Sequence, residues 1–111
     1  MKPIFILTDE NTGSGAEMFL LRMVHHPMVR VIGDNTRGME VFGNMVFAKL
    51  PHSDIFVAIG SKYRILEYDN FELHGYKPDI KGKNWQDALD TAVSEYAHKF
   101  CANSFAQSRQ K

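Results

Sequence analysis

Cysteine, net charge and long hydrophobic runs are what this sequence lacks. Its one cysteine, Cys101, excludes an internal disulfide and leaves the redox compartment open. The 13 basic and 13 acidic residues cancel, so composition favours no nucleic acid or other polyanion as partner. No apolar run has the length of a membrane span. What remains is 111 residues with ordinary globular composition, 44% hydrophobic and 23% charged, which predicts a single domain over residues 1–111.

The first third of the chain predicts a strand, a helix and a second strand. Residues 3–8 are a continuous apolar run that is too short for a signal peptide and is followed at once by acidic residues. A helix is expected from Ser14 to just before Pro27, and because its apolar residues lie nearly all round, we expect it to be buried. Residues 29–33 form the second strand, which a right-handed crossover would place parallel to the first.

The middle of the chain alternates short strand-like runs with turns, which predicts an antiparallel meander. Residues 41–50 predict a strand with a bend at Gly43 and Asn44, since glycine inside a strand marks a distortion. The remaining elements follow in order: a turn at 51–53, a strand at 55–59, a turn at 60–62, a strand at 63–68, an irregular loop at 69–77 and a brief strand at 79–80.

The last element is an amphipathic helix with Asn84 as its N-cap. Cys101 lies on its apolar stripe, where a small buried hydrophobe is a better interpretation than a reactive thiol. The polar residues 104–111 are expected to fray. The stripe, spaced i, i+3, i+4 and i+7, consists of Trp85, Ala88, Leu89, Ala92, Val93, Tyr96, Ala97, Phe100 and Cys101.

Two interpretations of Ser14 stand side by side. The segment from Ser14 to Glu17 reads S-x-x-E, which is a capping box at the start of a helix. The same position, between two glycines at a strand-to-helix turn, would present the hydroxyl at the positive end of the helix, with the Gly15 N–H aimed where an oxyanion would form. The two interpretations are compatible.

Three segments in this order resemble the C-terminal-processing (tail-specific) serine peptidase family. They are residues 13–19 (G-S-G-A-E-M-F), residues 31–38 (V-I-G-D-N-T-R-G) and residues 75–80 (G-Y-K-P-D-I). The family has a small-S-small-x-E segment that opens a helix, a strand that ends in G-x-x-T-x-G, and a later G-x-x-P-D-[IV]. The resemblance covers about residues 3–97 and implies an α/β fold, part of the crotonase-like superhelix that is shared with ClpP-type proteases.

By this resemblance Ser14 occupies the nucleophile position and Gly15 supplies an oxyanion-hole N–H. The tail-specific branch has a lysine as general base where this chain has Met39, and a thioether cannot accept the serine proton. The tricorn-like branch has a glutamate three residues before the late glycine, and Glu72 matches it. Read without the resemblance, Glu72 is a solvated loop carboxylate.

The tricorn-like histidine, its serine partner and the second oxyanion donor all lie upstream of the nucleophile, and this chain begins one strand before Ser14. The resemblance therefore implies the C-terminal half of a catalytic domain, with the general base outside it. His74 lies near Glu72 and could serve as a base, although a surface histidine is the plainer interpretation. His25 and His26 fit a helix C-terminus, Asp9 and Glu10 should diverge on their turn, and no spacing predicts a metal or cofactor site.

The leading interpretation is a part of a serine endopeptidase that cleaves a polypeptide through an acyl-enzyme on Ser14, inactive by itself. The alternative is a non-catalytic binding or assembly module on the same fold. Unpaired strand edges and uncovered apolar surface predict a homo-oligomer or a swapped dimer. The family includes many exported bacterial enzymes, so the resemblance implies an extracytoplasmic parent protein, while this chain carries no signal peptide.

Overall fold

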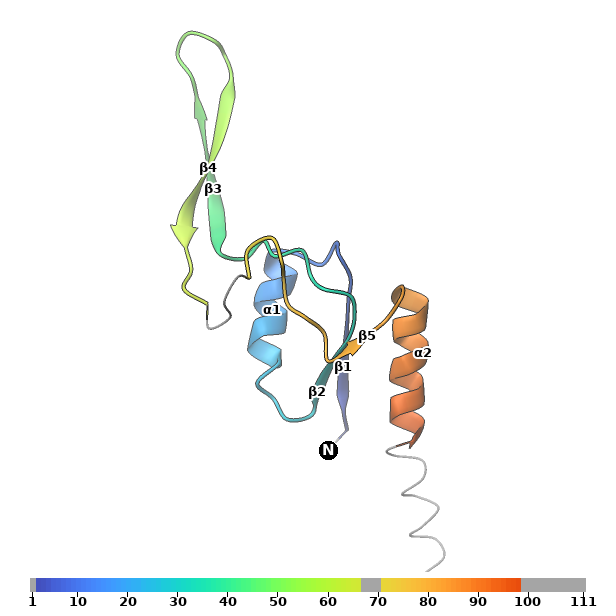
Figure 1. The fold of residues 1–111 in the computed structure, drawn as a ribbon. Coiled ribbons are helices and arrows are strands. Elements are labelled where there is room, and N and C mark those ends of the chain that lie inside the picture. The colour runs from blue at the N-terminus through green and yellow to red at the C-terminus, as the bar shows by residue number, and fades with distance from the viewer. Residues whose placement is uncertain (1, 67–70, 99–111) are drawn as a thin grey trace, which may run out of the picture.

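The computed structural model describes residues 2–66 and 71–98, and it has the mixed strand and helix content that the sequence predicts. Figure 1 shows a body made of a small sheet between two helices, with a long hairpin extending from it. The predictions for Cys101 and for the tail at residues 104–111 lie outside the described residues. The elements are β1 (Ile4–Thr8), α1 (Gly15–Met23), β2 (Val29–Gly33), β3 (Phe42–Lys49), β4 (Phe56–Tyr63), β5 (Ile80–Lys81) and α2 (Trp85–Tyr96).

The body is built on a parallel sheet with the strand order β1-β2-β5. The expected parallel pairing is confirmed, with Ile4 opposite Val29 and Thr8 opposite Gly33. Helix α2 packs on this sheet, where Ile32 and Ala88 are fully buried. Small alanines on the inner face of α2 allow it to approach the sheet closely, and burying a side chain such as Ile32 stabilises the fold by about 1.5–3 kcal/mol.

Helix α1 departs from the prediction in its length and its burial. It ends at Met23, so His25 and His26 lie beyond the helix in the turn that leads to β2. Only Glu17 and Leu20 are buried, and Phe19 is 57% exposed. The expectation of an all-round buried helix is therefore wrong for the described residues.

Strands β3 and β4 form one antiparallel hairpin, with Phe42 opposite Tyr63 and Lys49 opposite Phe56. The turn expected at residues 60–62 is wrong, since these residues lie inside β4 and Gly60 pairs with Met45. The bend expected near Gly43 and Asn44 is present as a left-handed backbone at Asn44 (φ 52°). Cross-strand pairing therefore overrides the local turn chemistry of the G-S-K segment.

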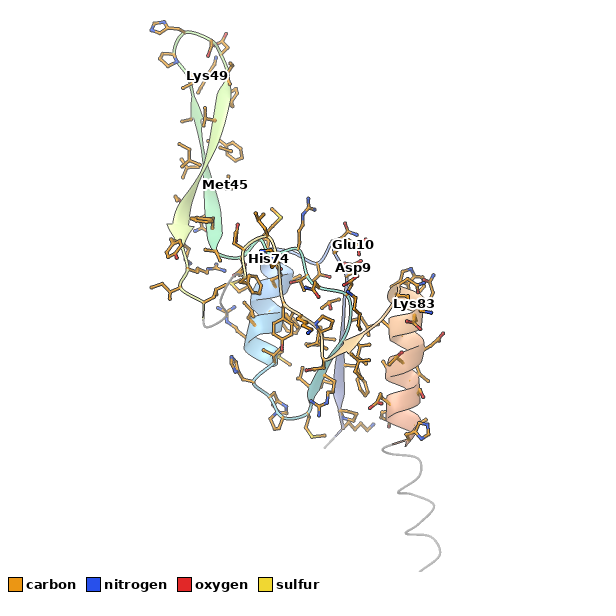
Figure 2. The ribbon with its side chains drawn as sticks, in the orientation of Figure 1. Asp9, Glu10, Met45, Lys49, His74 and Lys83 are labelled. Atoms are coloured by element: carbon orange, nitrogen blue, oxygen red, sulfur yellow. The ribbon has the colours of Figure 1, made fainter. Side chains whose placement is uncertain are left out.

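The hairpin exposes apolar side chains over most of its length, as the sticks in Figure 2 show around the labelled Met45 and Lys49. Directly opposed residues lie on the same face of a hairpin and faces alternate along each strand. Val46 opposite Ile59 thus belongs to one face and Phe47 opposite Ala58 to the other. Phe47 is 68% exposed. Both faces are apolar, unlike an ordinary surface hairpin that has one polar face.

The start of α2 agrees with its predicted cap. The Asn84 side chain accepts the N–H of Asp87 at 2.9 Å, and the Asp87 carboxylate accepts the N–H of Lys83 at 2.8 Å. The first bond satisfies an N–H group that a helix start otherwise leaves open, and the second fixes the residue before the N-cap. The helices in the described ranges are all too short or too polar to cross a membrane.

Candidate functional site

The segment between β1 and α1 is a compact turn held by Asp9. Its carboxylate accepts the N–H of Asn11 at 3.0 Å, the N–H of Thr12 at 2.9 Å and the Thr12 hydroxyl at 2.9 Å. The Thr12 hydroxyl, followed by these N–H groups, lowers the pKa of Asp9 below its ordinary value. Asp9 is therefore engaged in shaping the turn, while Glu10 is exposed beside it (Figure 2).

Ser14 follows this turn in a strained backbone conformation, with φ 52° and ψ −117°. Its carbonyl accepts the N–H of Met18 at 3.0 Å, which makes Ser14 the N-cap of α1. A positive φ at a residue other than glycine costs energy and persists only where the surrounding structure holds it. Ser14 is also exposed, so the strained residue presents its side chain to solvent.

Gly15 opens the helix next to an empty region. A Cβ built at Gly15 would meet nothing within 4 Å, and within the described part of the chain its N–H has no hydrogen-bond acceptor. This N–H belongs to the positive end of the α1 dipole. An anionic oxygen above the turn could therefore accept it.

Glu17 is the residue that holds the Ser14 turn in place, and it is fully buried. Its carboxylate accepts the N–H of Ser14 at 3.0 Å, of Gly38 at 2.6 Å and of Met39 at 2.8 Å. The reciprocal contact of the capping box, from the Glu17 N–H to the Ser14 side chain, is a close approach and not a full hydrogen bond. Glu17 thus joins the start of α1 to the loop after β2, a role that the S-x-x-E pattern alone did not reveal.

The loop after β2 is locked to residues 71–76 by glycines that admit no side chain. A Cβ at Gly38 would lie 2.5 Å from the Phe71 carbonyl oxygen, and one at Gly75 would lie 1.9 Å from that of Thr36. Both glycines have a positive φ. The buried Thr36 hydroxyl accepts the N–H of Tyr76 at 2.7 Å. The motif residues of the two segments therefore meet in space.

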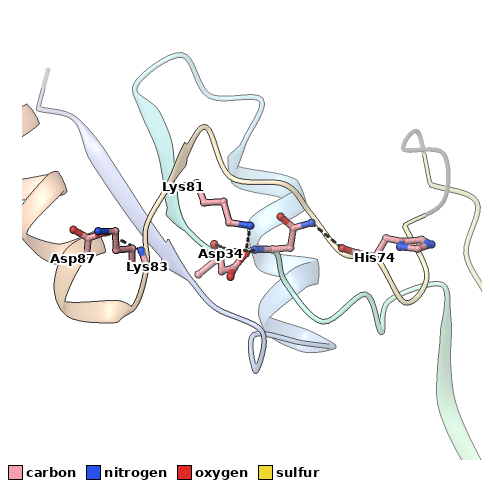
Figure 3. A network of polar contacts seen from close by, with 7 residues as sticks. Asp34, His74, Lys81, Lys83 and Asp87 are labelled. Carbon is pink, nitrogen blue, oxygen red and sulfur yellow. Dashed lines mark hydrogen bonds and ion pairs between the residues drawn. The ribbon is translucent and has the colours of Figure 1, made fainter.

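Polar contacts of Asp34 and His74 extend from this junction toward β5, as Figure 3 shows from close by. The Lys81 ammonium lies 3.2 Å from the Asp34 carboxylate, and the Asn35 side chain donates to the His74 carbonyl at 3.2 Å. The Asp79 carboxylate accepts the N–H of Val31 at 2.8 Å, which ties the P-D-I segment to β2.

Glu72 is half-buried, and its carboxylate accepts the N–H of Val41 at 3.2 Å. Glu17 and Glu72 therefore bind neighbouring N–H groups of one short segment, residues 38–41. The side chain of Met39, which stands at the position of the lysine in the tail-specific branch, is exposed at 46%. His74 contributes backbone hydrogen bonds to Phe71 and Asn35 and its side chain is exposed.

Glu40 is a further buried carboxylate that the sequence pattern did not single out. It forms an ion pair with Arg64, and their side chains are 5% and 24% exposed. An arginine directly after β4 thus neutralises a charge in the loop after β2, as a buried carboxylate requires. In the described ranges no three histidine, cysteine, aspartate or glutamate side chains gather as metal ligands.

The α/β body places Ser14 on a strained strand-to-helix turn at the start of α1. A model of peptidase family S41 matches residues 1–82, and the chain belongs to that family. Among curated proteins none matches this chain.

Two solved structures share the fold. One is a crystal structure of the tricorn protease, with 22% identity, a TM-score of 0.56, and coverage of 80% of this chain and 9% of that one. The other is a crystal structure of mature CPAF, with 21% identity, a TM-score of 0.51, and coverage of 88% of this chain and 19% of that one. The chain therefore spans less than a fifth of either structure's length, and at this identity the likeness concerns the fold.

Proposed function

We propose that this chain is the nucleophile-bearing part of a serine endopeptidase of the C-terminal-processing group, related to the tricorn-like branch and its crotonase-like fold. Ser14 attacks the peptide carbonyl, the Gly15 N–H stabilises the oxyanion, and Glu72 orients the residue that acts as general base. The observation that carries the proposal is the strained, exposed backbone of Ser14, held by the buried carboxylate of Glu17. Strain of this kind is typical of functional positions.

The general base comes from a segment outside residues 1–111. Met39 cannot accept a proton, and Glu72, whose carboxylate accepts the Val41 N–H, matches the orienting glutamate of the family pattern and not its base. Support for an additional segment comes from length, because the chain spans 9% and 19% of the two structures that share its fold. Catalysis then requires the complete peptidase domain, and residues 1–111 alone are inactive.

A fluorophosphonate probe tests the nucleophile in a protein that contains the complete domain. Covalent labelling should occur at Ser14, should vanish in Ser14→Ala, and should persist in Ser53→Ala, which removes an exposed hydroxyl from the hairpin turn. Glu72→Gln should slow labelling without abolishing it, because an orienting residue does not itself form the bond. A folded, complete domain that leaves Ser14 unlabelled would exclude this function.

A second candidate, a non-catalytic assembly module, is favoured by the apolar faces of the β3–β4 hairpin. Apolar patches of this extent mark interaction surfaces. The outer edge of β1 is also unpaired within the described sheet. We propose that a second copy of the chain covers these surfaces, as a homo-oligomer or a swapped dimer. Oligomeric state, measured without regard to activity, separates this candidate from the peptidase.

A further inference from the structure

Residues 38–41, which begin at the last glycine of the G-x-x-T-x-G motif, are held by carboxylates at both ends. Glu17 of α1 accepts two N–H groups at the start of the segment, at 2.6 and 2.8 Å, and Glu72 accepts the one at its end, at 3.2 Å. Glu40, between these contacts, is itself a carboxylate and is 4% exposed. A buried carboxylate needs a partner of opposite charge, so the partner of Glu40 also determines where this segment lies.

Arg64 contacts this segment twice. Its N–H donates to the Val41 carbonyl at 2.8 Å, and its guanidinium forms the ion pair with Glu40. The two side chains of the pair are 24% and 5% exposed, so salt and water screen it less than a surface pair. Because Arg64 directly follows β4, the pair fastens the base of the hairpin to residues 38–41.

The ion pair lies beside space into which Glu40 could move. Both of its side chains line a cavity of about 250 Å³ beside α1, together with Met18 and Leu21. An ionised carboxylate that has no partner is drawn toward water. Without the charge of Arg64, Glu40 would therefore turn toward the cavity, and the backbone of the preceding residue, Met39, would move with it.

A movement of Met39 reaches Ser14 through a single atom. Glu17 Oε2 accepts both the Met39 N–H, at 2.8 Å, and the Ser14 N–H, at 3.0 Å. The positive φ of Ser14, 52°, persists only while the surrounding structure holds it. The contacts thus run without a gap from the base of the hairpin to the Ser14 turn, which gives coupling between the two a physical route.

We propose that Arg64 is a positioning residue for the reaction of Ser14. The inference rests on the proposed peptidase function and adds a residue that its catalytic assignments do not contain. In this role Arg64 acts only through Glu40 and the segment that shares Glu17 with Ser14. Its loss should slow the bond-forming step and leave binding unchanged, since a small misplacement of a reacting group lowers the rate of chemistry steeply.

Fluorophosphonate labelling of a protein that contains the complete domain separates these two effects. The labelling rate, measured against probe concentration, gives a maximal rate for bond formation and a half-maximal concentration for binding. Arg64→Gln should lower the maximal rate about 10- to 100-fold and change the half-maximal concentration by less than about twofold. Arg30→Gln, which replaces an exposed arginine of β2, is the matched control and should change neither. An unchanged maximal rate in a folded Arg64→Gln domain overturns the proposal.

Arg64→Lys is the conservative variant. Lysine keeps the positive charge that Glu40 requires but lacks the planar fork of the guanidinium, so the maximal rate should fall only about two- to tenfold. This variant carries the test where Arg64→Gln does not fold, and a parental maximal rate would then contradict positioning. Loss of folded protein alone lowers the fraction that is finally labelled, and leaves the maximal rate of the labelled part unchanged. That result would make the role of Arg64 structural only.

Removing the charge of Glu40 tests the route. Arg64→Gln combined with Glu40→Gln leaves no buried charge without a partner, so this double variant should label faster than Arg64→Gln alone. A double variant that is as slow as Arg64→Gln, or slower, would show that Arg64 does not act through Glu40.

Failure of this inference and failure of the peptidase function are distinguishable. A parent domain labelled at Ser14, with an Arg64→Gln variant labelled at the same maximal rate, overturns the positioning role alone. A folded, complete domain that leaves Ser14 unlabelled overturns the peptidase function, and with it any role of Arg64 in the reaction.

Discussion

The buried carboxylate of Glu17 accepts the backbone N–H of Gly38 at 2.6 Å, across 21 residues of sequence. The same carboxylate accepts the N–H of Ser14, so one side chain determines the position of the α1 start relative to the loop after β2. Hydrogen bonds to an ionised acceptor are stronger than neutral ones, and they are strongest where water is excluded. The geometry of the Ser14 turn therefore depends on Glu17.

Replacing Glu17 by glutamine should destabilise the fold by about 2–3 kcal/mol, because an amide brings N–H donors to a place that holds backbone N–H groups. Urea unfolding of residues 1–111 measures this loss. Glu10→Gln, at an exposed position two residues after β1, should stay within about 0.5 kcal/mol of the parent chain. A Glu17→Gln chain as stable as the parent would show that the buried charge is dispensable.

Gly75→Ala should destabilise the fold by at least about 3 kcal/mol, since its Cβ would overlap the Thr36 carbonyl and its φ is 66°. Gly15→Ala is the matched comparison. No atom lies within 4 Å of the Cβ it would add, so its stability should be unchanged or slightly raised. Thermal melts of the two variants decide the matter, and equal losses would contradict the close packing of residues 71–76 on the loop after β2.

The Asn35 N–H, followed by the Lys81 ammonium, lowers the pKa of Asp34 below the ordinary value of 3.8. A depressed folded-state pKa means that ionised Asp34 favours the fold above its unfolded-state pKa, and that this contribution is lost as pH falls through the folded-state pKa. Asp34→Asn should thus be less stable than the parent at neutral pH, with the difference shrinking in acid. Urea midpoints against pH measure it. With Asp90→Asn as exposed control, a gap independent of pH would refute the linkage.

Introducing threonine at Val46 and Phe47 should weaken self-association, because one lies on each hairpin face and threonine keeps strand propensity. Light scattering of the parent chain should give a mass that rises with concentration, while the double variant should remain at the mass of one chain. Ala48→Thr, also exposed on the hairpin, leaves the large apolar side chains in place and should behave as the parent. A parent chain that stays monomeric throughout would end the assembly proposal.

The parallel strands and α2 could be predicted because their signals are local. Asn84 caps α2 as expected, and two residues of the apolar stripe, Ala88 and Ala92, are the buried ones of the helix. The glycines of the G-x-x-T-x-G and G-x-x-P-D segments could be recognised as positions of unusual backbone geometry. The sequence did not show that Gly38 packs against the segment that contains Gly75. That relationship is set by tertiary contact, at 2.6 Å between a Cβ on Gly38 and the Gly75 nitrogen.

The parts of the site that could not be predicted are those whose partners are distant in sequence. Glu17 looked like a capping residue because only its bond to Ser14 is local. Nothing near Glu40 in the sequence marks Arg64 as its partner, although a carboxylate between apolar residues was a signal that it needs one. The cavity beside α1 combines residues of α1, the loop after β2 and the end of β4, so no linear pattern encodes it.

The hairpin begins and ends at one point, since the Arg64 N–H donates to the Val41 carbonyl at 2.8 Å. Once it has formed, the path from β2 to β5 behaves as a loop of roughly half its covalent length. Halving a flexible loop lowers its closure cost by about 0.6 kcal/mol. Hairpins also form from neighbouring residues within microseconds, before distant strands can pair. We therefore expect early formation of the hairpin to shorten the path between Gly33 and Ile80, and so to favour docking of β5 onto β2.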